Sequence, residues 1–249
     1  MIDLHCHMLP GIDDGAQSLA VSLEMARIAS DDGITVTACT PHLLPGLFDN
    51  PGPAVRRMVQ DFQDTLLEAG SGLQVTTGAD VHLTPHTVAE IRSGHALTLN
   101  DTRYFLLEPP HMTAPPGFFQ AVTGILASGF IPVITHPERL AWIDAHYPVF
   151  DKLARQGCLM QLTAGALAGQ FGGRAERVAW QMIDEGIADV VASDAHSAGR
   201  RRPVLSRARR LVESRFGPER ARKMFVETPA LILSNKSVER HFPSRASLP

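Results

Sequence analysis

The chain has 249 residues, of which 44% are hydrophobic and 20% charged, and a formal net charge of -3 at pH 7. This length can bury a sizeable core and suits one large α/β domain or two small ones. A charge so close to neutral excludes a molecule-wide attraction to nucleic acid or to an anionic membrane.

Short apolar runs rich in β-branched residues recur along the chain and predict seven strands. These runs are "MIDLH" from Met1, "ITVTACT" from Ile34, "LQVTTGA" from Leu73, "RYFLLE" from Arg103, "FIPVIT" from Phe130, "GCLMQLT" from Gly157 and "IADVVAS" from Ile187. Helix-period segments separate most of them, as in "SLAVSLEMARIASDDG", which begins with a serine. Glycines are expected to end five helices: Gly33, Gly70, Gly129, Gly157 and Gly186. The alternation predicts a parallel sheet closed or wound by crossover helices.

Most predicted connections are short, so we expect a single domain over residues 1–240. Two longer loops, Pro41–Pro53 and Pro109–Pro116, follow strands. The last residues, 241–249, are expected to form a frayed tail.

Cysteine usage and the first residues indicate the compartment. Cys6, Cys39 and Cys158 form no CxxC pair, which favours a reducing compartment over a disulfide framework. The N-terminal segment carries acidic and histidine residues where a signal peptide needs a basic start and an apolar run. No stretch approaches the roughly 18 apolar residues of a membrane span. We expect a cytoplasmic protein without a transmembrane segment.

Almost every predicted strand runs into a side chain that can bind a metal ion. In chain order these side chains are His5 and His7, His42, Asp80 and His82, Glu108, His136, and Asp194 and His196. Because the C-terminal ends of parallel strands in a barrel lie on one rim, we expect them to converge. Imidazole and carboxylate ligands without cysteine suit manganese, iron or zinc with open coordination positions. The sequence therefore predicts a polynuclear metal site.

Other residues near these motifs are interpreted as ordinary. Alternation along the first strand turns Cys6 away from its two histidine neighbours, as a small buried residue. Structural or solvated roles are assigned to His82, His86, His95, His111, His146 and His241.

Cationic side chains follow two of the candidate ligands. Arg139 stands three residues after His136 in "THPERL", and a run from Arg200 to Arg202 follows His196. A metal cluster with open positions activates water and holds phosphate oxygens, and phosphoryl transfer needs cationic donors around those oxygens. This combination predicts phosphoester hydrolysis, with one arginine of the run at the site.

Four motifs in this order, "DLHCHMLPGIDDGA", "ACTPH", "THPER" and "SDAH", resemble the polymerase and histidinol phosphatase (PHP) superfamily. More narrowly, they resemble its manganese-dependent bacterial protein tyrosine phosphatases of capsular and exopolysaccharide operons. The resemblance runs from Met1 to about Val238 and includes "LTAGALAGQFGGRA". It implies an α/β fold, a distorted (β/α)7 barrel of the PHP type. Three divalent ions, Mn²⁺ first and Fe or Zn as alternatives, are implied at the C-terminal rim of the strands.

The resemblance also implies a role for each ligand. The implied sets are His5, His7, Glu108 and Asp194 for one metal, Asp80, Glu108 and His136 for a second, and Asp14, His42 and His196 for a third. Position 80 is Asp where those phosphatases more usually have Glu, so its carboxylate has a shorter reach. Where they have one arginine after "SDAH", counting from Asp194 favours Arg201 and the following Pro203 favours Arg202. We take Arg201.

These residues predict a phosphoric monoester hydrolase of the protein tyrosine phosphatase class. We expect in-line attack by a metal-bound hydroxide, charge stabilisation by Arg139 and Arg201, and His42 or a metal-bound water as an optional acid. The resemblance implies a phosphotyrosine protein as partner, the tyrosine-rich tail of a bacterial autokinase that controls polysaccharide synthesis. A cysteine-dependent mechanism is excluded, because the residues six positions after the three cysteines are Ile12, Pro45 and Ala164, not arginine.

Three alternatives remain open at this point. One is a small-molecule phosphatase acting on histidinol phosphate or a sugar phosphate. Another is a nuclease, for which "GRRRPVLSRARR" would follow a phosphate backbone. That cluster lacks interleaved aromatic residues, and no nucleic acid partner is expected. The third is a non-catalytic barrel that senses a phosphoprotein or a metal.

Overall fold

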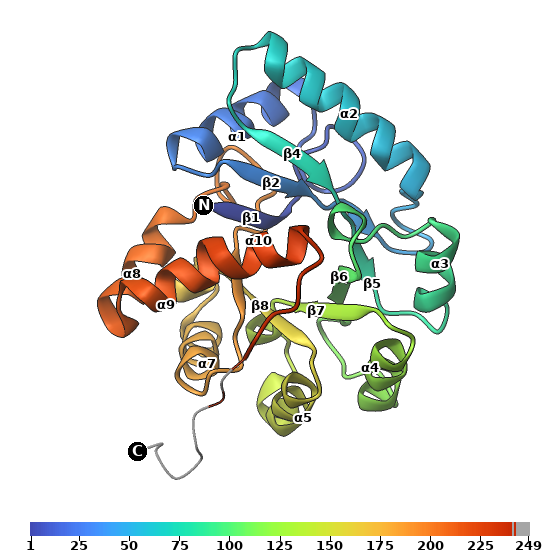
Figure 1. Cartoon of the computed structure of the whole chain (residues 1–249), viewed down its shortest axis with the longest axis vertical. Helices are drawn as coiled ribbons and strands as arrows, with labels where there is room; N and C mark the ends of the chain where they lie inside the picture. Colours follow the sequence, from blue (N-terminus) through green and yellow to red (C-terminus); the bar gives the residue numbers. More distant parts are fainter. Residues whose placement is uncertain (241, 243–249) are drawn as a thin grey trace.

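The computed structural model describes residues 1–240 and 242, so most of the predicted tail, 241–249, lies outside the described residues. Parallel strands form the centre of the molecule (Figure 1). The strands are β1 (Ile2–Cys6), β2 (Val36–Cys39), β3 (His42–Leu43), β4 (Gln74–Thr77), β5 (Asp80–His82), β6 (Tyr104–Glu108), β7 (Ile131–Thr135), β8 (Leu159–Thr163) and β9 (Val190–Ala192).

The strands form two hydrogen-bonded groups, β1-β2-β4 and β3-β5-β6-β7-β8-β9. The second and third predicted strands are each split, into β2 and β3 and into β4 and β5, so the predicted loop from Pro41 begins with a short strand. Pro41 has no N–H to continue a ladder. Gly78 lies between β4 and β5, and Thr40 lies between β2 and β3. A Cβ on Gly78 would lie 2.8 Å from Cγ2 of Thr40, so only glycine allows the two segments to approach this closely.

Backbone hydrogen bonds between the first and last strands close the ring. The N–H of Asp194 donates to the carbonyl of His5 at 2.8 Å, and the N–H of His7 donates to the carbonyl of Ala195 at 2.9 Å. The predicted distorted (β/α)7 barrel is therefore confirmed, with each split strand counting as one barrel position.

Helices surround the strands (Figure 1). They are α1 (Leu19–Asp31), α2 (Gly52–Glu68), α3 (Thr87–Ser93), α4 (Phe118–Ala127), α5 (Ile143–Arg155), α6 (Ala164–Leu167), α7 (Gly173–Asp184), α8 (Ser206–Phe216), α9 (Pro218–Arg222) and α10 (Thr228–Leu233), with shorter turns η1 (Leu99–Asp101), η2 (Pro137–Arg139) and η3 (Lys223–Glu227). The hydroxyl of Ser18 caps α1 by accepting from the N–H of Val21. The five glycines predicted to end helices all have positive φ, the conformation that a helix C-terminus requires. No helix within residues 1–240 has the length and hydropathy needed to cross a bilayer.

The barrel interior changes from apolar to polar toward the C-terminal ends of the strands. Its buried apolar cluster comprises Leu4, Ala38, Leu99, Tyr104, Leu106, Val133, Leu159, Val190 and Ile232. Two residues after Leu106, Val133 and Leu159, the same side of each strand carries a polar residue: Glu108, Thr135 and Gln161. The candidate site is built on this polar layer.

Candidate metal centre

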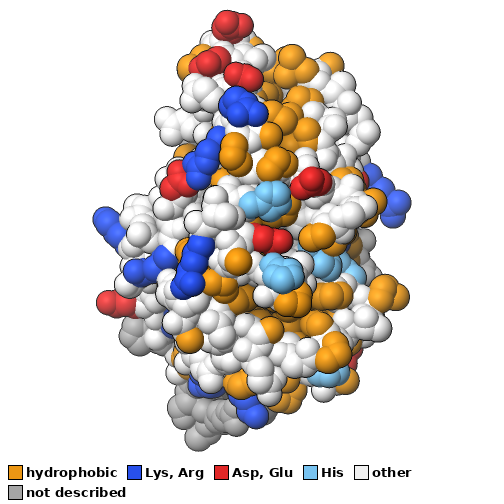
Figure 2. Space-filling view, turned by 90° about the vertical axis from the view of Figure 1, so that its right-hand side faces the viewer, with side chains coloured by type: hydrophobic (Ala, Val, Ile, Leu, Met, Phe, Trp, Pro, Cys, Tyr) orange, Lys and Arg blue, Asp and Glu red, His pale blue; other side chains and the backbone are white. Residues whose placement is uncertain are grey.

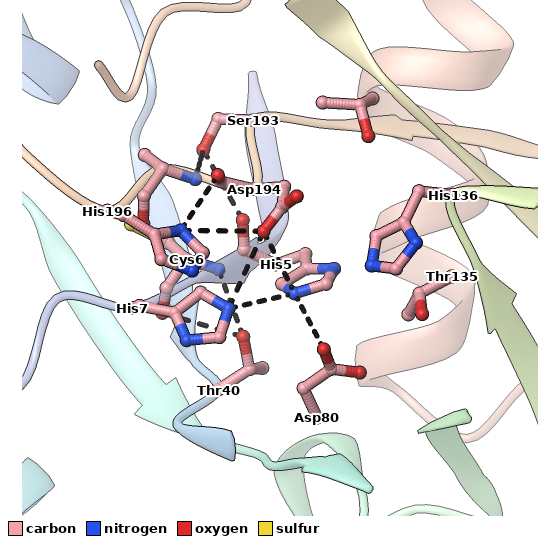
Figure 3. Close-up of polar contacts among 12 residues, drawn as sticks. His5, Cys6, His7, Thr40, Asp80, Thr135, His136, Ser193, Asp194 and His196 are labelled. Carbon is pink, nitrogen blue, oxygen red and sulfur yellow. Dashed lines mark hydrogen bonds and ion pairs between the residues drawn. The ribbon is translucent and has the colours of Figure 1, made fainter. Parts of the chain in front are cut away.

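His5 and His7, at and just beyond the end of β1, point toward each other (Figure 3), and their Nε2 atoms lie 3.1 Å apart. Nδ1 of His7 lies 2.8 Å from Oδ2 of Asp13, and Nδ1 of His5 lies 2.9 Å from Oε1 of Gln161. Because each partner is an acceptor, both Nδ1 atoms carry the proton in the neutral rings. Each Nε2 then presents a lone pair. Two facing lone pairs repel unless a proton or a metal ion lies between them, so the neutral pair is suited to bind a metal ion.

Two carboxylates face these lone pairs. Oδ2 of Asp80 lies 3.3 Å from Nε2 of His5, and Oδ1 of Asp194 lies 3.4 Å from Nε2 of His5 and 3.5 Å from Nε2 of His7. Asp80 is fully buried, and neither of its oxygens has a hydrogen-bond partner. Such a buried carboxylate is costly unless a positive charge, a protonated imidazole or a metal ion, lies beside it. This donor set therefore fits a divalent ion.

A second group of ligand atoms lies at the solvent side of the rim. Oδ1 of Asp14 lies 3.3 Å from Nε2 of His196 and 3.5 Å from Nε2 of His42. The ring of His7 packs against that of His196, with centroids 3.8 Å apart. The Asp14 side chain is 54% exposed. Figure 2 shows histidine and acidic side chains reaching the surface together on one face of the molecule.

Both carboxylate oxygens of Glu108, at the end of β6, lie close to imidazole nitrogens. Oε1 lies 3.2 Å from Nε2 of His111 and 3.7 Å from Nε2 of His136, and Oε2 lies 3.4 Å from Nδ1 of His42 and 3.6 Å from Nδ1 of His82. Structural or solvated roles are expected for His82 and His111 from sequence, whereas both lie against Glu108. Two features of the sequence indicated these contacts: His82 stands at a strand end, and His111 stands three residues after Glu108.

The remaining histidines with assigned ordinary roles lie elsewhere or outside the described residues. His146 contacts the carbonyl of Trp142, His95 lies near Asp49, His86 is exposed, and His241 is outside the described residues.

The grouping of ligand atoms agrees with the expected sets only in part. Asp14, His42 and His196 come together as expected, and His7 joins them. Asp80 groups with His5 and His7, and also with His42 and Glu108, despite its shorter side chain. Glu108 and His136 come together with the unexpected His111. The nine predicted ligands thus line one continuous site, in which Asp80 lies between two of the groups.

Asp194 joins the imidazoles to two arginines. Its Oδ2 accepts from both guanidinium groups, Nη1 of Arg139 and, at 2.6 Å, Nη2 of Arg201, while its Oδ1 faces His5 and His7. Arg201 also donates to the Asp194 carbonyl at 3.0 Å. The guanidinium of Arg139 lies 4.4 Å from the centre of the Phe171 ring, a cation–π contact that helps to hold it.

Neighbouring charges shift the pKa values of the site. Burial would lower the pKa of His5, but the carboxylates of Asp80 and Asp194 outweigh it and raise that pKa to about 10. In the same way, Glu108 and Asp80 overcome the burial of His42 and raise its pKa to about 9. Burial and the charge of Arg139 lower the pKa of His136 well below its usual range. With no metal bound, the site therefore holds protons on His5 and His42 at neutral pH.

The backbone is strained at two of these positions and closely packed at a third. His136 and Asp194 have φ values of 35° and 50°, in the left-handed region that favours glycine. The buried Asp3 holds the turn before Asp194, because its carboxylate accepts from the N–H and the hydroxyl of Ser193. A Cβ on Gly15 would lie 2.3 Å from the carbonyl oxygen of His7, so only glycine fits there. The roles of Asp3 and Gly15 were not predicted from sequence. For Asp3, a carboxylate within an apolar strand was an available indication.

Comparison with known proteins places this site in a family. The family model for capsular polysaccharide synthesis proteins, CpsB/CapC, matches residues 1–234. The chain belongs to the CpsB/CapC family. It is 34% identical over 243 residues to the tyrosine-protein phosphatase YwqE of Bacillus subtilis (strain 168), and the match covers 98% of this chain and 95% of the relative. Similarity to the tyrosine-protein phosphatase CpsB of Streptococcus agalactiae serotype V is 26% identity, covering 94% and 99% of the two chains.

Solved structures agree with the CpsB/CapC assignment. One solved structure superposes with a TM-score of 0.92 at 34% identity over 97% of both chains. It belongs to a pair of metal-dependent tyrosine phosphatases, YwqE of Bacillus subtilis and CpsB of Streptococcus pneumoniae. A probable 2-pyrone-4,6-dicarboxylic acid hydrolase from Acinetobacter baumannii shares only the fold, with a TM-score of 0.57 at 13% identity. The family resemblance inferred from the four motifs is confirmed.

Proposed function

We propose that this member of the CpsB/CapC family is a metal-dependent protein tyrosine phosphatase. One observation carries the proposal: the buried carboxylate of Asp80, whose oxygens have no hydrogen-bond partner, and the facing imidazoles of His5 and His7 converge beside two arginines on one rim of the barrel. The arrangement combines metal donors with cationic phosphate donors, the two requirements of phosphoester hydrolysis. The names of the relatives as tyrosine-protein phosphatases support this substrate class.

We propose three divalent ions, with Mn²⁺ the first choice and Fe or Zn the alternatives. The donors are oxygen and imidazole nitrogen, without thiolate, which suits these metals. We assign the ligand sets inferred from the resemblance: His5, His7, Glu108 and Asp194; Asp80, Glu108 and His136; and Asp14, His42 and His196. Asp13 and Gln161 would orient two of the imidazoles.

Each protein group then has a definable task. When bound, the metals would lower the pKa of a water molecule and neutralise phosphate charge. Arg139 and Arg201 would bind the remaining phosphate oxygens and stabilise the charge of the transition state. The leaving phenolate has a pKa of about 10, so it needs less protonation than an alkoxide. His42, whose two ring nitrogens face Asp14 and Glu108, is proposed as the optional proton donor through the nitrogen that does not bind a metal.

We propose that the substrate is the tyrosine-rich tail of a bacterial autokinase that regulates capsule or exopolysaccharide synthesis, and that the protein acts in the cytoplasm. The family description supports a role in capsular polysaccharide synthesis, and the three cysteines are free thiols. We further propose that residues 1–240 act as a single PHP domain, because one core cluster connects helices from α1 to η3.

The function is tested with a phosphotyrosine peptide, a phosphoserine peptide, histidinol phosphate and a single-stranded oligonucleotide, each with Mn²⁺ and with EDTA. We expect Mn²⁺-dependent hydrolysis of the phosphotyrosine peptide at a kcat/KM at least about tenfold above the other substrates, equivalent to about 1.4 kcal/mol. The His136→Ala variant should lose this activity and retain the wild-type circular dichroism spectrum. Preference for histidinol phosphate or for the oligonucleotide would show that the protein is a small-molecule phosphatase or a nuclease instead. Failure to hydrolyse any of the substrates would indicate a non-catalytic binding protein.

A further inference from the structure

A cleft with four arginines lies directly beside the metal centre. Its volume is about 230 Å³, and we call it the arginine cleft. Its lining includes Gly165, Phe171, Arg200, Arg201, Arg202 and Arg207. A water molecule occupies about 30 Å³ in the liquid, so the cleft has room for a carboxylate or phosphate group with its attached side chain. Figure 2 shows Lys and Arg side chains to one side of the histidines on the face that carries the site.

Two residues connect this cleft to the catalytic rim. Arg201 lines the cleft and also donates to Oδ2 of Asp194. Phe171 lines it as well, and its ring lies under the guanidinium of Arg139. A peptide whose phosphotyrosine reaches Arg139 and Arg201 would therefore pass its neighbouring residues over or into the cleft.

Three of the four cleft arginines have no ion-pair partner among the described carboxylates, although Arg202 acts at longer range on Glu24 and helps Arg27 to lower its pKa. Arg200, Arg202 and Arg207 are exposed and form no ion pair with any described carboxylate, whereas Arg201 is paired with Asp194. No Asp or Glu is among the described residues that line the cleft. Three unpaired guanidinium groups around one hollow raise the local concentration of anions, and arginine matches carboxylate and phosphate geometry.

The packing beneath the cleft fixes its apolar wall. A Cβ on Gly165 in α6 would lie 2.5 Å from Oε1 of Gln170 and 2.9 Å from Cε2 of Phe171. Glycine at this position lets both side chains fold closely onto α6. The wall is therefore a preformed surface next to the cationic groups.

We propose that the arginine cleft binds a second anionic group of the substrate, a phosphate or carboxylate a few residues from the phosphotyrosine being hydrolysed. The inference rests on the proposed phosphotyrosine phosphatase function and adds the substrate class, a peptide with at least two anionic side chains. A second phosphotyrosine and a Glu each carry an anionic group that arginine can bind, so the experiment includes both.

The test compares phosphotyrosine peptides that differ at one position, one to three residues away: a second phosphotyrosine, Glu or Ala. With the wild-type holoenzyme, we expect kcat/KM to be about three to ten times higher for the two anionic peptides than for the Ala peptide. Raising the salt concentration should reduce this ratio because the cleft is open to solvent. An advantage for the second phosphotyrosine alone would assign the cleft to phosphate, and an equal advantage for Glu would assign it to anions in general.

Variants on α8 locate the effect. Arg207→Glu should reduce the ratio to about one, whereas Arg210→Glu, a matched charge reversal outside the cleft lining, should retain the wild-type ratio. Equal ratios in wild type and Arg207→Glu, or equal losses in both variants, would overturn the inference. The melting temperature of each variant shows whether it is folded.

A binding measurement separates this inference from the proposed function. Fluorescence anisotropy is recorded with labelled peptides that carry non-hydrolysable phosphonomethyl-phenylalanine beside either Glu or Ala. Tighter binding of the Glu peptide that disappears in Arg207→Glu supports the cleft even if turnover of phosphotyrosine is not found. Equal binding of both peptides by the wild type refutes the cleft while leaving the phosphatase function intact. Competition by an oligonucleotide stronger than by the Glu peptide would assign the cleft to nucleic acid instead.

Discussion

Oδ2 of Asp13 lies 2.8 Å from Nδ1 of His7, so an aspartate that is not itself one of the assigned ligands orients an imidazole of the metal centre. The same oxygen accepts from the backbone N–H of His42 at 3.0 Å, and Oδ1 accepts from the N–H of Gly15 at 2.9 Å. Burial would raise the pKa of Asp13, but its bond to His7 and its other hydrogen bonds lower it below its ordinary value. The carboxylate is therefore ionised at neutral pH and fixes the tautomer of His7.

Asp13→Asn tests this positioning role. An amide has one acceptor atom, so it cannot keep both the bonds to His7 and His42 and the bond to Gly15. We expect the affinity for Mn²⁺ to fall about tenfold to hundredfold, measured by calorimetry and by the Mn²⁺ concentration that half-activates hydrolysis. As a control, Asp49→Asn changes a carboxylate that is 82% exposed and lies near His95, outside the ligand groups, so this variant should bind Mn²⁺ like the wild type. Equal affinities for both variants would show that the orientation of His7 does not depend on Asp13.

Metal binding should release protons. In the metal-free site, carboxylates raise the pKa of His5 to about 10 and that of His42 to about 9, both above the ordinary value of 6.5. Below those pKa values a metal must displace the protons to reach the nitrogen lone pairs. Each displaced proton makes the apparent affinity rise about tenfold per pH unit, so it should increase between pH 6 and pH 8.

Calorimetry in buffers of different ionisation enthalpy counts the released protons directly. We expect about two protons per protein at pH 7 for the wild type, and about one for His42→Gln. Affinity that does not change from pH 6 to pH 8 would contradict the protonated state of the empty site.

The strand ends were predictable from sequence because they depend on local patterns. Alternating or continuous apolar runs mark the strands, and parallel topology brings residues such as His5, His136 and Asp194 to one rim. The split between β2 and β3 was not predictable, because it depends on the contact of Thr40 with Gly78, far along the chain.

The parts of the site that lie in loops were also harder to predict. His111 reaches Glu108 only because the loop after β6 turns back, and Asp13 and Asp14 are equivalent in sequence until the chain places one under His7 and the other beside His196. Family resemblance favoured Asp14 as the ligand. Within the arginine run, counting from Asp194 favoured Arg201 and the following Pro203 favoured Arg202, and it is Arg201 that pairs with Asp194 in the structure.

Metal removal should destabilise the fold. The buried oxygens of Asp80 have no hydrogen-bond partner, so a bound cation stabilises the native state and not the unfolded chain. With metal at 100 times its dissociation constant, this linkage supplies about 2.7 kcal/mol, which corresponds to a rise of about 5–10 °C in melting temperature.

Scanning calorimetry with Mn²⁺ and with EDTA measures this difference. Asp80→Asn should reduce it, because the amide keeps the shape of the side chain and loses its charge. A melting temperature that is the same with Mn²⁺ and with EDTA in the wild type would count against a metal bound by buried carboxylates.

Far from the site, Arg240 and Asp189 form a buried ion pair that attaches the last described residues to the barrel. Nε of Arg240 lies 2.7 Å from Oδ1 of Asp189, and its Nη atoms donate to the carbonyls of Ala154, Cys158 and Ile187. Burial raises the pKa of Asp189 to about 6, although Arg240 acts to lower it. Removing the arginine leaves a buried carboxylate without its counter-charge, so Arg240→Ala should lower the free energy of unfolding by about 3–5 kcal/mol.

The exposed Arg27, paired with Glu24 and Asp31, provides the matched control. Its side chain is 60% exposed, so solvent screens its ion pairs and Arg27→Ala should lower the free energy of unfolding far less than Arg240→Ala does. Urea denaturation at pH 8 and pH 5 measures both variants. Because the folded pKa of Asp189 lies above its ordinary value, its ionisation opposes folding as the pH rises, and without Arg240 that pKa is higher still. The deficit of Arg240→Ala should therefore be larger at pH 8 than at pH 5; an equal deficit at both would mean that lost packing, rather than an uncompensated carboxylate, is the cause.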